Sequence, residues 1–290
     1  MDVGRERFGG VVEWPGGRLD MTGRTLVMAV LNVTPDSFSD GGRFADSERA
    51  VRHGLELAEG GADVLDVGGQ STRPGSEPAG AEAEAERVVP VIRELAKWVS
   101  VPISIDTTES AVAEAALEAG ASIINDISAL RFDPQMASLA ADREVPVVLM
   151  HMQGTPATMQ IAPHYEDVRG EVKAFLLERM QYAASQGVDP QRIILDVGIG
   201  FGKRLEHNLD LLAHIDDFFE LGRPVLVGHS RKGFLGHLLE IEVTERDAAS
   251  LAVSAYLAGK GVHIVRVHQS KETRQAVGLI QRLKATAGGV

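Results

Sequence analysis

The stretch that decides the fold is Leu26-Val27-Met28-Ala29-Val30-Leu31-Asn32. Its first six residues are apolar without interruption, which predicts a strand buried on both faces. The run stops at the amide of Asn32, and residues 33–42 that follow are rich in Pro, Asp, Ser and Gly, which predicts a loop. Polar residues directly after a buried parallel strand are where α/β proteins place their sites.

Seven further segments repeat this pattern of a short apolar run that ends in a polar residue or glycine. The eight predicted strands cover residues 26–32, 64–68, 103–106, 123–126, 147–151, 193–196, 225–228 and 264–268. The helical patterns that follow them cover residues 47–59, 81–98, 109–119, 134–141, 165–185, 205–215, 244–258 and 270–285. Ser47 is the expected N-cap of the first helix.

Strict alternation of eight strands and eight helices predicts an α/β fold, the closed (β/α)8 TIM barrel. The competing fold is an open doubly wound sheet. Such a sheet usually carries Gly-x-Gly-x-x-Gly after its first strand, and the residues after Leu31 do not match that pattern. We therefore expect the barrel.

The first 24 residues predict a separate small element. Residues 11–14 and 19–21 flank Pro15-Gly16-Gly17, which is the pattern of a β-hairpin. We expect this N-terminal hairpin, residues 1–24, to plug the amino-terminal end of a barrel formed by residues 25–285. No linker or change in composition divides the barrel further.

Composition narrows the possible functions. The formal net charge is −12 and there is no basic stretch, which argues against a nucleic-acid partner. The absence of cysteine excludes disulfides and a thiol nucleophile. No apolar run is long enough for a signal peptide or a membrane span, so we expect a cytoplasmic protein without membrane contact.

The strand ends carry most of the chemistry that the sequence offers. The polar residues there are Asn32, Asp66, Asp106, Asn125, Asp126, His151, Asp196, Ser230, Lys232, Arg266 and His268. In a barrel they converge on one mouth. Each alone could cap the next helix, and for Asp106, before Thr107, capping and ligand binding are equally good interpretations. The whole set predicts a ligand site.

Two kinds of charge are present in this set. Asp106, Asn125 and Asp196 suit a flat ring rich in N–H donors, such as an aminopyrimidine. Arg266, His268 and Lys232 suit an anion, and Asn32 suits a Mg²⁺ ion that keeps most of its waters. Together these features predict group transfer from a diphosphate ester. The loops 34–42 and 68–75 are expected to close over the substrate.

Residues 198–203, Gly-Ile-Gly-Phe-Gly-Lys, resemble a phosphate-binding P-loop without matching it. Val197 and Arg204 occupy the positions that require Gly and Ser or Thr. We interpret this segment as a tight loop that lets a flat ligand approach. Phe201 either stacks on that ligand or belongs to the core.

Eight motifs together resemble the dihydropteroate synthase family of pterin-binding enzymes. They cover residues 31–42, 66–75, 105–107, 124–126, 149–152, 198–203, 230–232 and 266–268. The resemblance implies a homodimeric transferase with a (β/α)8 fold that uses Mg²⁺. It implies condensation of 6-hydroxymethyl-7,8-dihydropterin diphosphate with p-aminobenzoate, with sulfonamides as competitors.

The resemblance also assigns roles by motif. Catalytic roles fall to Asp106, Lys232, Arg266 and His268. Asp106, Asn125, Asp196 and Lys232 hold the pterin, and Ile127, Met150, Phe201 and Gly228 line its slot. Asn32, Thr72, Arg73, Arg266 and His268 bind diphosphate, with Asn32 as the metal ligand. Phe38, Pro74, Phe201, Ser230 and Lys232 flank p-aminobenzoate. The chain departs from the family pattern at Gln70, Val197, His229 and Gln269.

Two other functions share parts of this pattern. A pterin-dependent methyltransferase that serves a corrinoid protein would share the barrel and its acids, but it needs no diphosphate clamp such as Arg266 and His268. A non-catalytic pterin-binding paralogue would have no need of Lys232. The sequence therefore favours the synthase.

Overall fold

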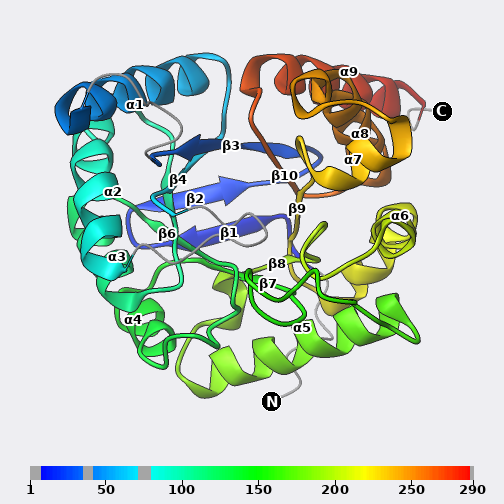
Figure 1. Cartoon of the computed structure of the whole chain (residues 1–290), viewed down its shortest axis with the longest axis horizontal. Helices are drawn as coiled ribbons and strands as arrows, with labels where there is room; N and C mark the ends of the chain where they lie inside the picture. Colours follow the sequence, from blue (N-terminus) through cyan, green and yellow to red (C-terminus); the bar gives the residue numbers. More distant parts are fainter. Residues whose placement is uncertain (1–7, 35–41, 71–79, 288–290) are drawn as a thin grey trace.

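The structure is a computed structural model that describes residues 8–34, 42–70 and 80–287 (Figure 1). Its strands are β1 (Val11–Trp14), β2 (Gly17–Asp20), β3 (Leu26–Asn32), β4 (Val64–Gly68), β5 (Ile103–Asp106), β6 (Ile123–Asp126), β7 (Val147–Met150), β8 (Ile193–Asp196), β9 (Val225–Gly228) and β10 (Ile264–Val267). Its α-helices are α1 (Gly42–Glu59), α2 (Ala81–Leu95), α3 (Ser110–Ala119), α4 (Met136–Asp142), α5 (Val168–Ser185), α6 (Leu205–Ala213), α7 (Gly233–Leu239), α8 (Asp247–Lys260) and α9 (Ser270–Ala287). Short 3-10 helices are η2 (Pro190–Arg192), η3 (Ile215–Leu221) and η4 (Val243–Glu245).

Eight parallel strands close into a barrel in the order β10-β3-β4-β5-β6-β7-β8-β9. The closing step is the pairing of β10 with both β9 and β3. This confirms the predicted (β/α)8 barrel and rules out the open sheet. The predicted strand bounds hold except that β7 and β10 each end one residue early, before His151 and His268.

The helices differ most from expectation at α1 and α7, and the other helices differ by one to three residues at their ends. Helix α1 begins at Gly42, so Ser47 lies inside it and the predicted N-cap was wrong. Helix α7 was not predicted, because its seven residues include two glycines, which are poor helix formers. Gly236 of α7 lies against the guanidinium of Arg246, which would have to shift for any larger residue, since a Cβ there would lie 2.2 Å from its Nη2. No helix within the described ranges is long and apolar enough to cross a membrane.

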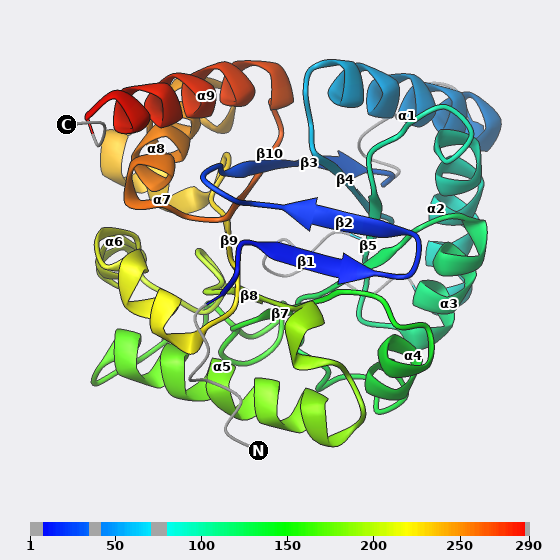
Figure 2. The same cartoon turned by 180° about the vertical axis from the view of Figure 1, so that it is seen from behind.

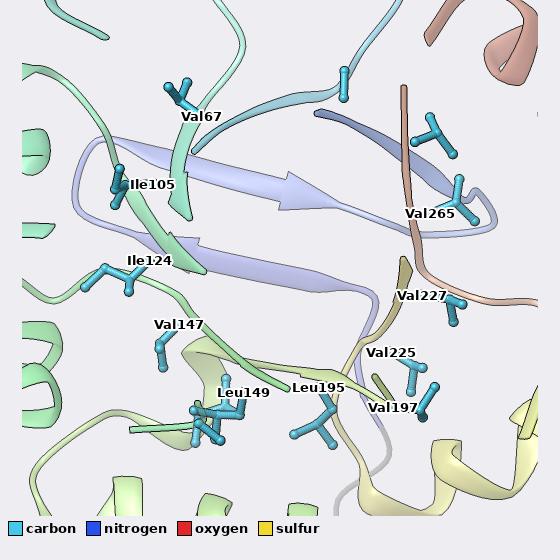
Figure 3. Close-up of a cluster of buried hydrophobic side chains, with 14 of the residues drawn as sticks. Val67, Ile105, Ile124, Val147, Leu149, Leu195, Val197, Val225, Val227 and Val265 are labelled. Atoms are coloured by element: carbon cyan, nitrogen blue, oxygen red, sulfur yellow. The ribbon is translucent and has the colours of Figure 1, made fainter. Parts of the chain in front are cut away.

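The main core lies between the strand ring and the surrounding helices. Figure 3 shows its strand residues splayed around the outside of the ring, among them Val67, Ile105, Ile124, Leu195 and Val265. Because successive strand residues point to opposite sides, the residues next to these point into the barrel. The apolar outer shell thereby fixes which polar residues face inward.

The hairpin β1–β2 covers the amino-terminal end of the barrel (Figure 2). Its residues Val12, Trp14, Leu19 and Met21 are buried, and they pack in one cluster with residues near the start of the strands. Those strand residues are Leu26, Met28, Val64, Ile123, Val148, Ile194, Leu226 and Ile264. The expected hairpin and its place at this end of the barrel are confirmed.

Candidate active site

The carboxyl ends of the strands bring distant polar residues into one row. Asp106 of β5 is in register with Gly68 of β4 and with Asn125 of β6. Arg266 of β10 is in register with Gly228 of β9. Residues far apart in the sequence therefore meet at one mouth, as the barrel prediction required.

Arg266 is the centre of an ion-pair network that we call the arginine network, formed with Asp66, Asp106 and Asn125. Its Nε donates to Oδ2 of Asp66 at 2.5 Å, and its Nη2 donates to Oδ2 of Asp106 at 2.6 Å. Asn125 Nδ2 donates to the same Asp66 oxygen at 3.0 Å. Asp66 is fully buried, whereas the Asp106 side chain keeps 11% of its surface exposed. Asp106 is thus the acid of this network that faces the mouth.

The charges of this network do not balance. Burial opposes a charge on Arg266, but Asp66 and Asp106 outweigh it and raise the pKa of the guanidinium. Burial raises the pKa of Asp106 to about 7, although Arg266 acts in the opposite direction, and Asp66 adds to the increase. One permanent cation is therefore shared by two carboxyl groups.

The structure separates the neighbours Asn125 and Asp126, of which the sequence analysis assigned only Asn125 to the ligand. Asn125 points inward to Asp66. Asp126 accepts hydrogen bonds from the backbone N–H groups of Ser128 at 2.7 Å and Leu130 at 2.8 Å. Asp126 is therefore occupied in shaping the turn after β6. For Asp106, the structure favours a position facing the mouth over a capping role, because no side chain of its own segment caps α3.

A second group of polar residues lies beside the β8 loop, which we define as residues 197–204. The ammonium of Lys232 donates to the carbonyl of Ile199 and sits 4.3 Å from the centre of the Phe201 ring. Burial lowers the pKa of Lys232 to about 8, with Asp196 partly restoring the charge. Asp196 accepts from the Gly198 N–H at 2.8 Å, and burial raises its pKa, opposed by Lys232.

One side of this mouth is apolar. Ile127, Met150, Met152 and Met159 form a buried cluster against which Phe201 packs. Gly228 lies beside Arg266 and Asp196, and a Cβ there would lie 3.8 Å from both, at ordinary contact distance. An apolar wall next to acids and amides is suited to a flat, polar-edged ring.

Ser230 and His268 meet on the other side of Arg266. His268 Nδ1 and Ser230 Oγ share a hydrogen bond of 3.0 Å. Burial lowers the pKa of His268 to about 3, and the cations Arg231 and Arg266 lower it further. His268 is thus a neutral imidazole at ordinary pH and adds no positive charge to the mouth.

Arg231 of the Ser-Arg-Lys segment is held in the left-handed region at φ +59°. Its guanidinium binds Asp247 through two hydrogen bonds of 2.6 and 3.0 Å. Gln269 donates to the same carboxylate at 2.6 Å. The departure Gln269 therefore ties the segment after β10 to the segment after β9.

Other predicted residues have plainer environments. Asn32 is exposed at the end of β3, in register with Gly68. Phe38, Thr72, Arg73 and Pro74, with most of both expected lid loops, lie outside the described residues. The remaining departures Val197 and His229 are buried, and His229 contacts Ser254 Oγ at 2.9 Å. Across residues 8–34, 42–70 and 80–287, no group of three or more acidic or histidine side chains could hold a metal ion.

Sequence reasoning noted Asp66 as a strand end but assigned it no role, although it anchors both Arg266 and Asn125. It also overlooked Asp247. The sequence did contain a signal for Asp66. The other inward-facing acids were assigned to the ligand site because they lie at strand ends, and Asp66 lies near one as well. Nothing local marks Asp247, whose partner Arg231 is 16 residues away.

Buried acids, an amide, a lysine and an arginine at the carboxyl end of a barrel are typical of an enzyme active site. The sequence model of the family described as "Pterin binding enzyme" matches residues 28–268 of this chain. The match covers all eight barrel strands except the first two residues of β3.

Comparison with individual relatives shows which family of pterin-binding enzymes this chain belongs to. The chain is 44% identical over 266 residues to the dihydropteroate synthase of Escherichia coli strain K12, covering 92% of this chain and 94% of that one. Two solved dihydropteroate synthases superpose on it. The Yersinia pestis enzyme in complex with a sulfonamide drug has a TM-score of 0.90 at 39% identity, covering 95% of this chain and 99% of that one. The Xanthomonas albilineans enzyme with 4-aminobenzoic acid has a TM-score of 0.89 at 45% identity, covering 95% and 98%. This chain belongs to the dihydropteroate synthase family.

Proposed function

We propose that this chain condenses 6-hydroxymethyl-7,8-dihydropterin diphosphate with p-aminobenzoate, which yields 7,8-dihydropteroate and diphosphate. The observation that carries the proposal is Arg266, bound to Asp66 and Asp106 and neighboured by His268. This cation lies between acids suited to a heterocycle and a neutral imidazole suited to an anion. Family membership supports the same reaction.

The pterin is proposed to bind between the arginine network and the β8 loop. Asp106, Asn125 and Asp196 accept from or donate to the ring edge, and Lys232 donates to it. Ile127, Met150, Phe201 and Gly228 form the faces of the slot. In support, Asn125 already gives its N–H to Asp66, which leaves the amide oxygen for a donor on the ring.

The reaction is proposed to begin with diphosphate departure. The bond between the pterin methylene carbon and the diphosphate oxygen breaks, and the electron pair leaves with the oxygen. Arg266 and His268 stabilise the departing charge, while the Asp106 carboxylate stabilises the cationic methylene. The p-aminobenzoate nitrogen then forms the new C–N bond and loses a proton. Ser230, Lys232 and Phe201, with Phe38 and Pro74, are proposed to flank this second substrate, and Thr72 and Arg73 to assist with the diphosphate.

Mg²⁺ is proposed to bind through Asn32. The fit is consistent with the chemistry of the ion, because Mg²⁺ commonly keeps several waters and takes only one or two protein ligands beside substrate phosphates. The Asn32 amide is exposed at the mouth and offers one such oxygen. When bound, the ion would neutralise charge on the diphosphate.

We further propose that the protein is a cytoplasmic homodimer in which sulfonamides compete with p-aminobenzoate. Helices α7, α8 and α9, which lie side by side in Figures 1 and 2, and η4 supply an apolar face for a dimer. Its exposed side chains are Leu238, Leu239, Val243, Tyr256, Leu279 and Leu283. Residues 25–285 are proposed as the catalytic unit and residues 1–24 as its end plug. Analytical ultracentrifugation tests the dimer.

The decisive experiment measures diphosphate release from the pterin diphosphate, with and without p-aminobenzoate. We expect release and formation of dihydropteroate to be stoichiometric when both substrates are present. Binding of the pterin without any turnover would instead identify a non-catalytic paralogue. Methyl transfer from methyltetrahydrofolate to a corrinoid protein would identify the methyltransferase.

A further inference from the structure

Lys203 is a buried lysine of the mouth to which the proposed reaction gives no role, and burial lowers its pKa well below the ordinary lysine value. Its side chain is almost fully enclosed, with the residue 3% exposed. The ammonium donates to the carbonyls of Gly198 at 2.9 Å and Phe201 at 3.0 Å, and contacts Nδ1 of His151 at 2.9 Å. With the His151 carbonyl at 3.5 Å as well, these contacts enclose the Lys203 amino group, so it is not open to a ligand.

These contacts join the β8 loop to the end of the neighbouring strand. Gly198 lies near the start of the loop and Phe201 in its middle, whereas His151 directly follows β7. The approach is so close that a Cβ on Gly198, at φ +68°, would lie 1.8 Å from the His151 carbonyl oxygen. Only glycine permits this contact.

The outer side of the β8 loop is held by other elements. The Tyr165 hydroxyl donates to the Gly202 carbonyl at 2.8 Å, and Asn208 accepts from the Gly200 N–H at 2.6 Å. Lys203 ties the same loop to His151, beside Asp196, which accepts from the Gly198 N–H, and Lys232, which donates to the Ile199 carbonyl. Removal of Lys203 would therefore loosen the loop at Gly198 and Phe201 and leave its contacts with Tyr165 and Asn208 in place.

The inner side of the β8 loop is the part that contacts Lys232. The Ile199 carbonyl accepts from the Lys232 ammonium, and the Phe201 ring lies 4.3 Å from it. At Gly200 a Cβ would lie 3.0 Å from Cδ of Lys232, so the lysine stem rests on the loop backbone. The environment of Lys232 is thus set by the position of this loop.

We propose that Lys203 is a positioning residue, which locks the β8 loop against His151 so that Ile199 and Phe201 hold Lys232 in place for the pterin. The inference rests on the proposed function, because it assigns Lys232 to that substrate. Lys203 acts through the loop and does not touch the substrate.

The charged groups around Lys203 and Lys232 determine which binding measurements the loss of the Lys203 side chain would change. Asp196 acts on both lysines, and Arg266 and Asp106 also act on Lys232. None of these is bonded to Lys203, so removing its side chain leaves the arginine network intact. The effect on the pterin and the effect on an anion at Arg266 should therefore separate.

The test is Lys203→Met, which keeps an unbranched side chain of similar size and removes the donors. We expect the KM for the pterin diphosphate to rise at least about tenfold, while the Kd for pyrophosphate alone changes by less than about twofold. Water admitted around Lys232 should raise its pKa from about 8 toward its ordinary range. The alkaline limb of the kcat/KM profile should move up with it.

Thr25→Val is the matched control. It removes a buried donor to a loop carbonyl, Thr25 Oγ1 to Val262 at 2.6 Å, at the start of β3 and far from the mouth. It should lower stability without changing the KM or the alkaline limb.

The inference fails if Lys203→Met keeps the wild-type KM and alkaline limb. It also fails if the variant weakens pyrophosphate and pterin equally, because that pattern is general unfolding, which thermal denaturation would register. A wild-type protein that binds pyrophosphate but no pterin would overturn the proposed function instead.

Discussion

The two ends of the barrel are built from the same eight strands in opposite ways. At the amino-terminal end, Trp14 and the other buried hairpin residues pack against apolar side chains from at least seven barrel strands. Together these side chains fill the opening. At the carboxyl end, Arg266 holds Asp66 and Asp106, and Lys232 rests on the β8 loop. One end buries apolar area and the other buries charge.

This difference shows that the start of each strand contributes mainly to stability and its end mainly to the chemistry. Apolar contacts at the plug are many and non-directional, so each contributes to the free energy of folding. Buried charges at the mouth are costly and depend on few partners, and Asp66 Oδ2 alone serves two donors. Substitutions at the two ends should therefore affect different measurements.

The largest effect is expected at the mouth. Asp106→Ala and Lys232→Ala should each lower kcat/KM by about a hundred- to a thousandfold, because charge stabilisation in the transition state is lost. Steady-state kinetics measure the loss, and circular dichroism should report a normally folded protein. Near wild-type turnover in both variants would refute these roles.

The reverse pattern is expected at the plug. Trp14→Ala should lower the free energy of unfolding by about 3–5 kcal/mol, since it removes a large buried side chain. The kcat/KM of the folded protein should change by less than about twofold. Urea denaturation and kinetics on the same sample test this. A large loss of activity with unchanged stability would mean that the plug communicates with the mouth.

A smaller effect is expected for Asp66→Asn, and its sign is informative. Removing a negative charge beside Arg266 should strengthen pyrophosphate binding if electrostatics alone decide. We expect binding to weaken by about tenfold, because Arg266 loses a charge-assisted hydrogen bond that orients it. Titration calorimetry measures the change.

The matched control for Asp66→Asn is Asp126→Asn. Asp126 is an equally buried carboxyl group whose partners are backbone N–H groups. It should lower stability and leave pyrophosphate affinity unchanged. Tighter pyrophosphate binding by Asp66→Asn would show that Asp66 only reduces the local charge.

The smallest effect is a pH dependence. Burial raises the pKa of Asp106 to about 7, so its carboxylate is lost as the pH falls through that value. Burial lowers the pKa of Lys232 to about 8, so its ammonium is lost as the pH rises through that value. The kcat/KM profile should therefore be a narrow bell. Lys232→Arg should remove the alkaline limb from the measurable range, and a limb that persists belongs to another group.

Much of the fold could be read from the sequence, because each buried strand is a short apolar run between polar residues. Helix α7 could not, since its seven residues include the poor helix formers Gly233 and Gly236. The mouth was predicted as a set of strand ends. Asn125 alone of the pair Asn125 and Asp126 was assigned to the ligand from the sequence. Local pattern could not show which of the two points inward, because Ile123 and Ile124 before them are both buried and show no alternation.

The ion pairs of the arginine network lay equally beyond the sequence. Arg266 is 200 residues from Asp66 and 160 from Asp106. No spacing rule connects positions so far apart, and only closure of the barrel does. The motif resemblance supplied roles for Arg266 and Asp106 but not the Asp66 anchor between Arg266 and Asn125.

The crowded contact at Gly198 restricts how this protein can evolve. With the His151 carbonyl filling the space of any side chain, that point of the chain cannot accept a mutation without moving two neighbouring strands. A lineage under pressure to exclude an inhibitor must then remodel some other part of the rim. The same crowding makes Gly198 a fixed reference point for anyone who redesigns the specificity of this enzyme.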